Sequence, residues 1–128
     1  MREEIYPTVS IKRKVEEIYG QRIKKALQGK KLEVSAFSQK YSTIFDVGKY
    51  SNNNRASIEL IMDDYEGEPF CTLTCNLPDV ELNNREVLIK TWSENEEVSE
   101  CARKSGLFRD TGKRVPTGFV QAEIWEVL

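Results

Sequence analysis

The segment RASIELIMDDYEGEPFCTLTCNL, residues 55–77, decides the fold, because two strand-like runs flank a turn-forming stretch. In each run every second residue is apolar, and a period of two places those residues on one face of a strand. The intervening DDYEGE has the composition of a turn. We therefore predict an antiparallel hairpin. The residues predicted to face one core are Ile58, Leu60, Met62, Cys71, Leu73 and Cys75.

Further strands are predicted on both sides of this hairpin. The runs 41–50 (YSTIFDVGKY) and 86–92 (EVLIKTW) are rich in β-branched and aromatic residues, and the chain closes with an alternating run in 118–128 (GFVQAEIWEVL). Residues 76–86 predict a loop, because Pro78 cannot donate to a central ladder. The pattern thus indicates about five strands.

A basic helix is predicted before the first strand. Apolar residues recur at helical spacing from Ile11 to Leu27, with Ser10 as the expected N-cap and Gly29 just past the end. Gly20 costs about 1 kcal/mol inside a helix relative to alanine. Arg22 interrupts the apolar stripe, so its side chain either extends into solvent or contacts an anion.

A short second helix is predicted before the last strand. Ser93 and Glu96 have the spacing of a capping box, and Gly106 is placed to end the helix. The fold class is α+β, with an antiparallel sheet of about five strands, an N-terminal helix and this short helix. We predict a single domain over residues 1–128, made of a basic helical segment (1–31) and an α+β core (32–128).

The composition argues against several classes of function. The chain has no histidine, which is the side chain most often used for proton transfer near neutral pH, and three cysteines, an odd number. Cys71 and Cys75 fit an apolar strand face better than a metal site, while Cys101 and Asp110 lack catalytic partners in the sequence. We therefore expect no enzyme activity, no metal and no cofactor.

The sequence also predicts where the protein is found. No apolar run approaches the roughly 20 residues that a membrane-spanning helix needs. The first residues, MREEIYPTVSIKRK, contain no apolar central region or cleavage site of a signal peptide. These features predict a soluble, cytoplasmic protein with no membrane partner.

The stretch GLFRDTGKRVPTG, residues 106–118, has the outline of a phosphate loop but not its spacing. Five residues separate Gly106 from Gly112, Arg114 stands where Ser or Thr is required, and a predicted helix precedes the stretch instead of following it. We interpret residues 110–113 as a hairpin turn, after which residues 116–118 begin the final strand.

Charge is segregated along the chain. Residues 1–58 contain 12 basic and 6 acidic residues, residues 59–100 contain 2 and 12, and residues 101–128 contain 5 and 3, giving +6, −10 and +2. These blocks are either solvated faces or binding surfaces. The candidate acidic partner-binding residues are Asp63, Asp64, Glu66, Glu68, Glu94, Glu96, Glu97 and Glu100. The candidate basic residues are Lys12, Arg13, Lys14, Arg22, Lys24 and Lys25.

The C-terminal part of the chain, about residues 56–128, resembles a family of small proteins of unknown function. Its members are carried by phages, plasmids and conjugative elements of Gram-positive and Bacteroidetes bacteria. The motifs that carry the resemblance are Asn76-Leu77-Pro78, Ser93-Glu94-Asn95-Glu96, Thr111-Gly112 and Gly118-Phe119. The resemblance implies a mobile-element accessory protein in the bacterial host cell, a class often concerned with host defence.

Two functional hypotheses follow. The first is an anti-CRISPR or anti-restriction protein that binds a host nuclease, or its nucleic-acid complex, and inhibits it without turnover, its acidic residues substituting for phosphates. The alternative is a nucleic-acid-binding or regulatory protein that uses the basic helix. The acidic pI of about 5.4 counts against the alternative, and no helix-turn-helix spacing is present.

Overall fold

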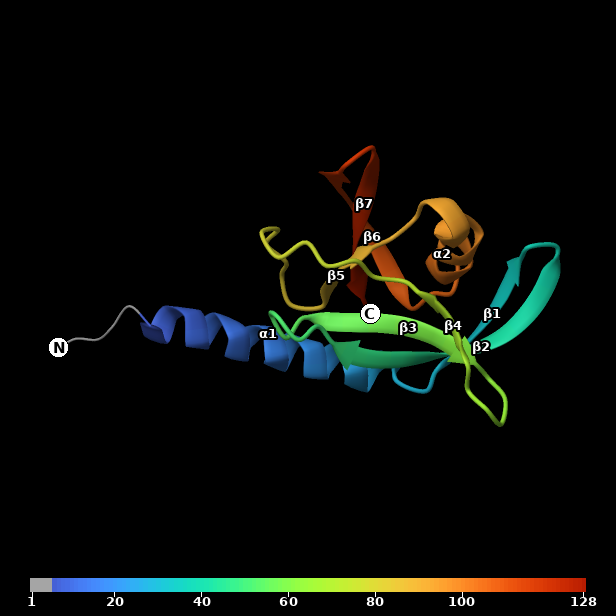
Figure 1. Ribbon diagram of the computed structural model, residues 1–128, viewed down its shortest axis with the longest axis horizontal. Coiled ribbons are helices and arrows are strands. Elements are labelled where there is room, and N and C mark those ends of the chain that lie inside the picture. The colour runs from blue at the N-terminus through green and yellow to red at the C-terminus, as the bar shows by residue number, and fades with distance from the viewer. Residues whose placement is uncertain (1–5) are drawn as a thin grey trace.

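The computed structural model describes residues 6–128 and contains two helices, a short 3₁₀ turn and seven strands within that range (Figure 1). In chain order these are α1 (Tyr6–Leu27), β1 (Lys31–Ala36), β2 (Gln39–Lys49), β3 (Ala56–Met62), β4 (Pro69–Thr72), β5 (Glu86–Ile89), η1 (Ser93–Asn95), α2 (Glu96–Arg103), β6 (Phe108–Thr117) and β7 (Val120–Val127).

The strands form two antiparallel sheets that are joined at one edge. The first sheet has the order β1-β2-β3-β4 and the second has the order β5-β7-β6. After β4 the chain reaches β5 through a bridge between Thr74 and Ile89, and the amide of Lys90 donates to the carbonyl of Leu73 at 2.8 Å. The two sheets therefore follow one another as a single curved wall around the core.

Helix α2 covers the free edge of this wall at β1. The amide of Phe37 donates to the Glu97 carboxylate at 3.2 Å, and the amide of Ser35 points at the Cys101 sulfur at 3.4 Å. An uncovered edge strand presents unpaired amides that invite pairing with other chains. The side chains of α2 satisfy two of these amides, so the helix protects the edge.

One main core fills the space between the two sheets, α1 and α2. Phe45 and Leu60 enter it from the first sheet, and Trp125 from the second, where the Phe108 and Trp125 rings meet edge to face at 5.4 Å. A smaller cluster lies on the outer face of the second sheet, where Leu88 and neighbouring side chains are covered by the segment 75–82. The second sheet is therefore buried on both faces.

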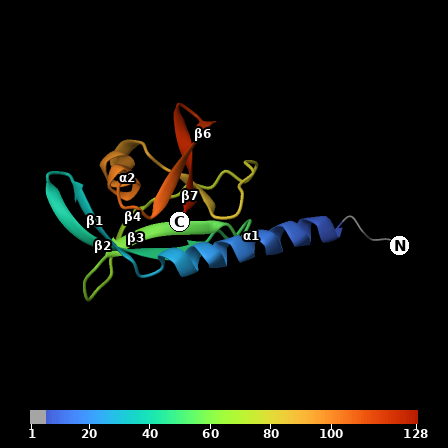
Figure 2. The ribbon, with the colours of Figure 1, turned by 180° about the vertical axis from the view of Figure 1, so that it is seen from behind.

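Helix α1 packs only its C-terminal half against the first sheet. Ile23 and Leu27 are buried there, whereas the N-terminal half extends past the end of the sheet in both views (Figures 1 and 2). At Gly20 a β-carbon would lie 3.4 Å from the carbonyl oxygen of Asn54, so the backbones approach closely at this point. This close approach explains a glycine inside a helix.

The structure confirms an α+β fold with an N-terminal helix and a short helix before the last strands, but the strands number seven instead of about five. The sequence pattern did not predict β1 or β6. Residues 31–36 (KLEVSA) alternate buried and exposed, yet they follow directly on the helix. The run 108–117 is rich in charged residues and contains Gly112 and Pro116, which hide a strand pattern.

The predicted turn at residues 110–113 is wrong. This segment is an irregularity within β6, with Gly112 at φ +83°, and the hairpin turn lies at Gly118, between β6 and β7. A glycine in the left-handed region serves a bulge as well as a turn, so local composition alone did not separate the two.

Both predicted helix starts also need correction. Helix α1 begins at Tyr6, which places Ser10 inside it, and residues 1–5 of the predicted basic segment lie outside the described residues. Ser93 has φ +54° and begins the 3₁₀ turn, while Asn95 precedes α2 without a side-chain capping bond. The side-chain amide of Asn95 (Nδ2) donates instead to the Thr72 carbonyl at 2.7 Å, so a tertiary contact positions this helix.

The central hairpin forms as predicted, with two exceptions in its core, one of which is Met62, a half-buried residue that belongs to neither cluster. Ile58, Leu60 and Leu73 are fully buried and Cys71 packs against the main core, but Cys75 packs against the outer cluster. The strand ends at Thr72, and beyond it the chain crosses to the second sheet. Beyond Thr72 the period-two pattern therefore no longer predicts which side chains face the main core.

Candidate functional site

The exposed part of α1 carries the candidate basic residues. The side chains from Ile11 to Lys14 are exposed, and they lie on the half of the helix that extends past the sheet (Figure 2). Among the candidate basic residues, those exposed on α1 are Lys12, Arg13, Lys14, Arg22, Lys24 and Lys25. Within residues 6–128 none of these six forms an ion pair, and only Arg13 forms a hydrogen bond, to the Ser51 carbonyl at 3.4 Å. One element therefore brings all six together.

The same helix also exposes apolar side chains. Ile11 is 59% exposed and Ile18 is 50% exposed, and the two lie seven residues apart, on the same side of the helix. Arg22 follows Ile18 by four residues, on that side as well. The projecting surface of α1 is thus basic with apolar side chains between the charges.

The acidic candidates lie on two separate elements. Asp63, Asp64, Glu66 and Glu68 belong to the β3–β4 hairpin, whereas Glu94, Glu96, Glu97 and Glu100 belong to η1 and α2. In both ribbon views the hairpin and α2 extend to opposite sides of the first sheet (Figures 1 and 2). The eight carboxylates therefore do not form one continuous face.

Several of these carboxylates already have partners. Asp63 pairs with Lys31 at 3.3 Å, Glu94 with Lys90 at 3.0 Å and Glu100 with Arg103 at 2.8 Å. Asp64 accepts hydrogen bonds from two amides in its own turn. These contacts are local and solvent-exposed, and such pairs contribute about 0 to 1 kcal/mol each.

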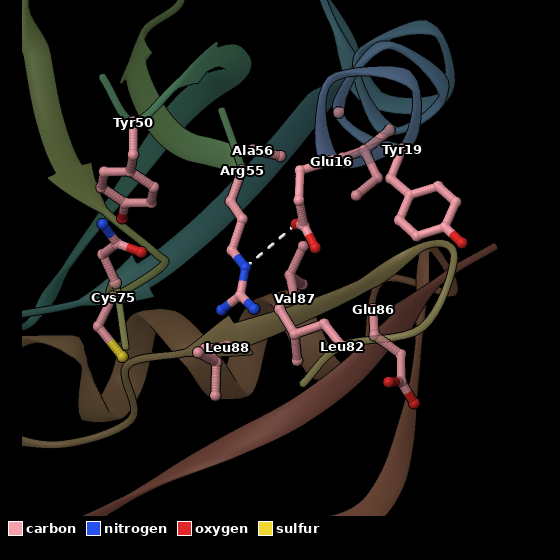
Figure 3. Close-up of a pocket in the computed structure, with 13 residues that line it drawn as sticks. Glu16, Tyr19, Tyr50, Arg55, Ala56, Cys75, Leu82, Glu86, Val87 and Leu88 are labelled. Atoms are coloured by element: carbon pink, nitrogen blue, oxygen red, sulfur yellow. Dashed lines mark hydrogen bonds and ion pairs between the residues drawn. The ribbon is translucent and has the colours of Figure 1, made fainter. Parts of the chain in front are cut away.

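A buried ion pair positions α1 on the domain (Figure 3). Arg55 begins the chain segment that enters β3, and its Nε donates to the Glu16 carboxylate at 3.1 Å. Its other nitrogens donate to the carbonyl of Leu77 at 3.0 Å and to that of Val80. The Arg55 side chain is 6% exposed and that of Glu16 is 12% exposed. Arg55 therefore links α1 to the loop that covers the second sheet, a role that the sequence did not reveal.

A small cavity of about 20 Å³ lies beside this pair, between α1 and the loop before β5. Tyr19, Tyr50 and Glu86 are among the residues that line it (Figure 3). A space of this size holds about one water molecule. The cavity is therefore too small for a substrate.

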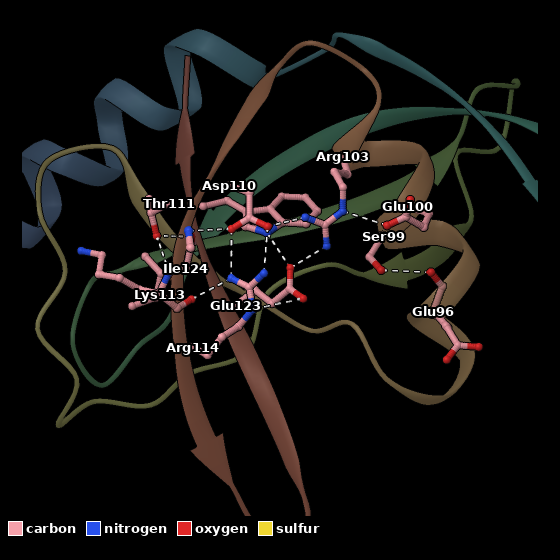
Figure 4. A network of polar contacts seen from close by, with 12 residues as sticks. Glu96, Ser99, Glu100, Arg103, Asp110, Thr111, Lys113, Arg114, Glu123 and Ile124 are labelled. Atoms are coloured by element: carbon pink, nitrogen blue, oxygen red, sulfur yellow. Dashed lines mark hydrogen bonds and ion pairs between the residues drawn. The ribbon is translucent and has the colours of Figure 1, made fainter.

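The charged residues of the former phosphate-loop candidate belong to an ion network on the second sheet (Figure 4). Arg103 of α2 donates to Glu123 at 2.6 Å and also to Asp110, and its guanidinium lies 4.9 Å from the centre of the Trp125 ring. Arg114 donates to Asp110 at 2.9 Å. The network fixes α2 against β6 and β7.

Contacts in this region lower the pKa of two carboxylates, Asp110 and Glu86. Hydrogen bonds from Arg114, together with those from the Gly112 amide and Arg103, hold the pKa of Asp110 well below its usual range, against the opposing effect of burial. Burial acts to raise the pKa of Glu86, but hydrogen bonds from Lys113 and from a backbone amide outweigh it, so this pKa is lowered. The basic tip of β6 is thus neutralised within the fold.

The thiols of Cys71 and Cys75 are poor nucleophiles in this fold. Burial raises the pKa of the Cys71 thiol to about 12, and the negative charge of Glu94 acts in the same direction. Burial also raises the pKa of Cys75. No group of three or more cysteine or acidic side chains in the described part of the chain is arranged to hold a metal ion.

Comparisons with known proteins place the larger part of the chain in one family. A family model described as a domain of unknown function (DUF4313) matches residues 44–125, which is 82 of the 128 residues. No curated protein and no solved structure matches the chain. Within residues 6–128, no helix has the length and apolar character needed to cross a membrane. The matched region begins in β2, so α1 and β1 lie outside it.

Proposed function

Because the chain belongs to the DUF4313 family, whose description names no activity, we propose a function from its own geometry: it binds nucleic acid, without turnover, through the basic surface of α1. The observation that carries this proposal is the gathering of six exposed basic side chains on one helix that extends past its sheet. A cationic surface of this kind attracts polyanions and releases their counterions.

The length of this surface supports a polymeric partner. Thirteen residues separate Lys12 from Lys25, and a rise of 1.5 Å per residue spreads these charges over about 20 Å. Charges spread over this length can contact several phosphates of one strand, whereas a single small anion contacts only one or two of them. The acidic pI does not oppose such binding, since the carboxylates lie mainly on other elements.

Fluorescence anisotropy with labelled 20-nucleotide single strands of DNA and RNA, and with duplex DNA, tests the proposal. If six phosphates of a single strand are contacted, log Kd rises with log salt with a slope of about 4, at roughly 0.7 per contact. Affinity then falls about 300-fold between 50 and 200 mM salt. Binding that is absent at 50 mM salt, or insensitive to salt, would contradict the proposal.

Charge-matched variants locate the surface. Replacement of Lys12, Arg13 and Lys14 by Gln is expected to lower the slope by about 2 for a single strand. Lys30, Lys40 and Lys104 are exposed on other parts of the fold, so their replacement by Gln is the matched control. An equal loss in both triple variants would indicate that overall charge, and not α1, governs binding.

A second candidate function is inhibition of a host defence nuclease, as an anti-CRISPR or anti-restriction protein of a mobile element. Exposed carboxylates on α2, with Glu96 and Glu100 one turn apart, favour it by offering a local imitation of phosphates. A plasmid-interference assay in cells with a restriction or CRISPR system tests it. The unmodified protein is expected to reduce interference, and replacement of Glu96, Glu97 and Glu100 by Gln should restore it. If the unmodified protein leaves interference undiminished, inhibition of the system tested is excluded.

A further inference from the structure

A groove lies beside α1, on the side that faces the loop before β5. It has a volume of about 570 Å³ and is lined by Arg22, Lys25, Ala26, Asn84 and Arg85. Arg22 and Lys25 are three residues apart and therefore share a side of the helix. Arg85 comes from a loop that is distant in sequence, so the fold brings three positive charges to one groove.

These three charges have no counterion among the described residues. Between described residues, no ion pair or hydrogen bond engages the side chain of Arg22, Lys25 or Arg85. The two carboxylates next to Arg85 in sequence or by strand pairing already have partners: Glu86 binds Lys113 at 2.8 Å, and Glu126 binds Arg109 at 3.1 Å. Like charges that line one groove favour the binding of an anion there.

The backbone at Arg85 is a second, independent observation. This residue has φ +72°, a left-handed conformation that is strained for a residue with a β-carbon and that favours glycine. The amide of Val127 donates to the Arg85 carbonyl at 2.8 Å, and the amide of Glu86 donates to Asn83 at 3.0 Å. These bonds hold the strained turn and with it the position of Arg85 at the groove.

We propose that this groove binds a phosphate group of a single nucleic-acid strand. Arg22 and Arg85 supply planar guanidinium groups that can each donate two hydrogen bonds to phosphate oxygens, and Lys25 adds a point charge. Asn84 stands at the same groove with an amide that can both donate to and accept from a sugar or a base. A flexible strand can enter a groove between a helix and a loop, whereas the phosphates of a rigid duplex follow a fixed path.

The inference rests on the proposed function and refines it. It places one phosphate at the junction of α1 with the region that matches the family, since Arg85 lies inside residues 44–125 and Arg22 and Lys25 lie outside. The Arg55–Glu16 pair holds the two parts together and so maintains the groove. The exposed charges at residues 12–14 then contact the same strand further along the helix.

Arg85→Gly is the decisive variant, because it removes the guanidinium and relieves the strained φ at the same time. Its thermal stability is expected to equal or exceed that of the original protein, while binding of a labelled 12-nucleotide oligo-U weakens and the salt slope falls by about 0.7. Arg85→Lys keeps the charge and should keep that slope. Unchanged affinity and slope in Arg85→Gly would overturn the proposal.

Two further arms separate the possible outcomes. If Arg22→Gln with Lys25→Gln leaves oligo-U binding intact while the Lys12, Arg13 and Lys14 triple variant loses it, the groove proposal fails and the proposed function stands. If the original protein binds no oligonucleotide, both fail.

Titrations followed by NMR of the arginine Nε–H groups test which anion enters the groove. Oligo-U is expected to shift Arg22 and Arg85 at micromolar concentration, whereas inorganic phosphate should shift them only at millimolar concentration. Equal affinity for inorganic phosphate would replace the nucleic-acid strand with a free-phosphate ligand and overturn the proposal.

Discussion

Replacing Arg55 with methionine is expected to lower the free energy of unfolding by about 3 to 5 kcal/mol, the range for removing one partner of a buried ion pair. The variant leaves the Glu16 carboxylate, whose side chain is 12% exposed, without its guanidinium. It also leaves the carbonyls of Leu77 and Val80 without the donors that now satisfy them. Domains of this size have total stabilities of about 5 to 15 kcal/mol, so the loss is a large fraction.

Urea denaturation, followed by the fluorescence of the buried Trp125, measures this loss. With a typical slope of about 2 kcal/mol per molar urea, the midpoint should fall by about 2 M. The Glu16→Leu/Arg55→Met double variant is the control, because replacing both charges with apolar groups removes the uncompensated carboxylate. It should therefore be less destabilised than the sum of the two single variants.

Two results would refute this reasoning. One is a loss below about 1 kcal/mol in Arg55→Met, which is the range of an exposed pair. The other is additivity of the two single variants, which would mean that Glu16 and Arg55 are not coupled. Since the Arg55–Glu16 pair holds α1 beside the loop before β5, Arg55→Met should also weaken oligonucleotide binding when this is measured in buffer without urea.

Three further predictions concern pH, packing and thiol reactivity. The pKa of Asp110 is lowered in the fold, so its contribution to stability is present above the unfolded pKa of about 3.9 and is lost as pH falls below it. The urea midpoints of Asp110→Asn and of the original protein, measured at pH 7, 4 and 2.5, should therefore approach each other as the pH falls. A constant difference between the two midpoints would contradict this prediction. Gly20→Ala should change the free energy of unfolding by less than about 1 kcal/mol, because its better helix propensity offsets a β-carbon 3.4 Å from the Asn54 carbonyl oxygen. Gly20→Val should lower the melting temperature by several degrees. Equal melting temperatures of Gly20→Val and the original protein would exclude the close approach. The pKa of Cys71 is raised from 9.0 to about 12, so this thiol should react with iodoacetamide at pH 8 about 1,000-fold more slowly in the folded protein than in urea. Mass spectrometry measures the labelling. Rapid labelling of the folded protein would show an accessible thiolate and contradict the prediction.

The sequence predicted those elements whose signal lies within a few neighbouring residues. The β2-β3-β4 order followed from three alternating runs with turns between them, and Gly106, at φ +82°, follows α2 as expected. Signals that depend on distant partners were misread. Asn95, not Ser93, precedes α2, because the Thr72 carbonyl provides a hydrogen-bond partner that no local pattern contains.

The candidate site likewise has one part that could be predicted from neighbouring residues and one part that depends on tertiary contacts. The basic composition of α1 is a property of consecutive residues, and the sequence identified its six candidates. Arg85 is one of only two basic residues in the acidic block 59–100, and only the folded chain brings it beside Arg22 and Lys25. In the sequence Arg55 is likewise predicted to be the start of a strand, and its burial against Glu16 depends on how α1 packs on the first sheet.

The sequence by itself determined the α+β class, the central hairpin and the segregation of charge, since periodicity and composition are carried by neighbouring residues. Tertiary structure alone decided which charges meet. It separated the acidic residues onto two elements and neutralised the basic residues of β6 with Asp110, Glu123 and other carboxylates. It left the three charges of the groove without a partner among the described residues. The physical reason is that Coulomb interactions and hydrogen bonds depend on distance in space, and residues far apart in the chain become neighbours only when the core forms.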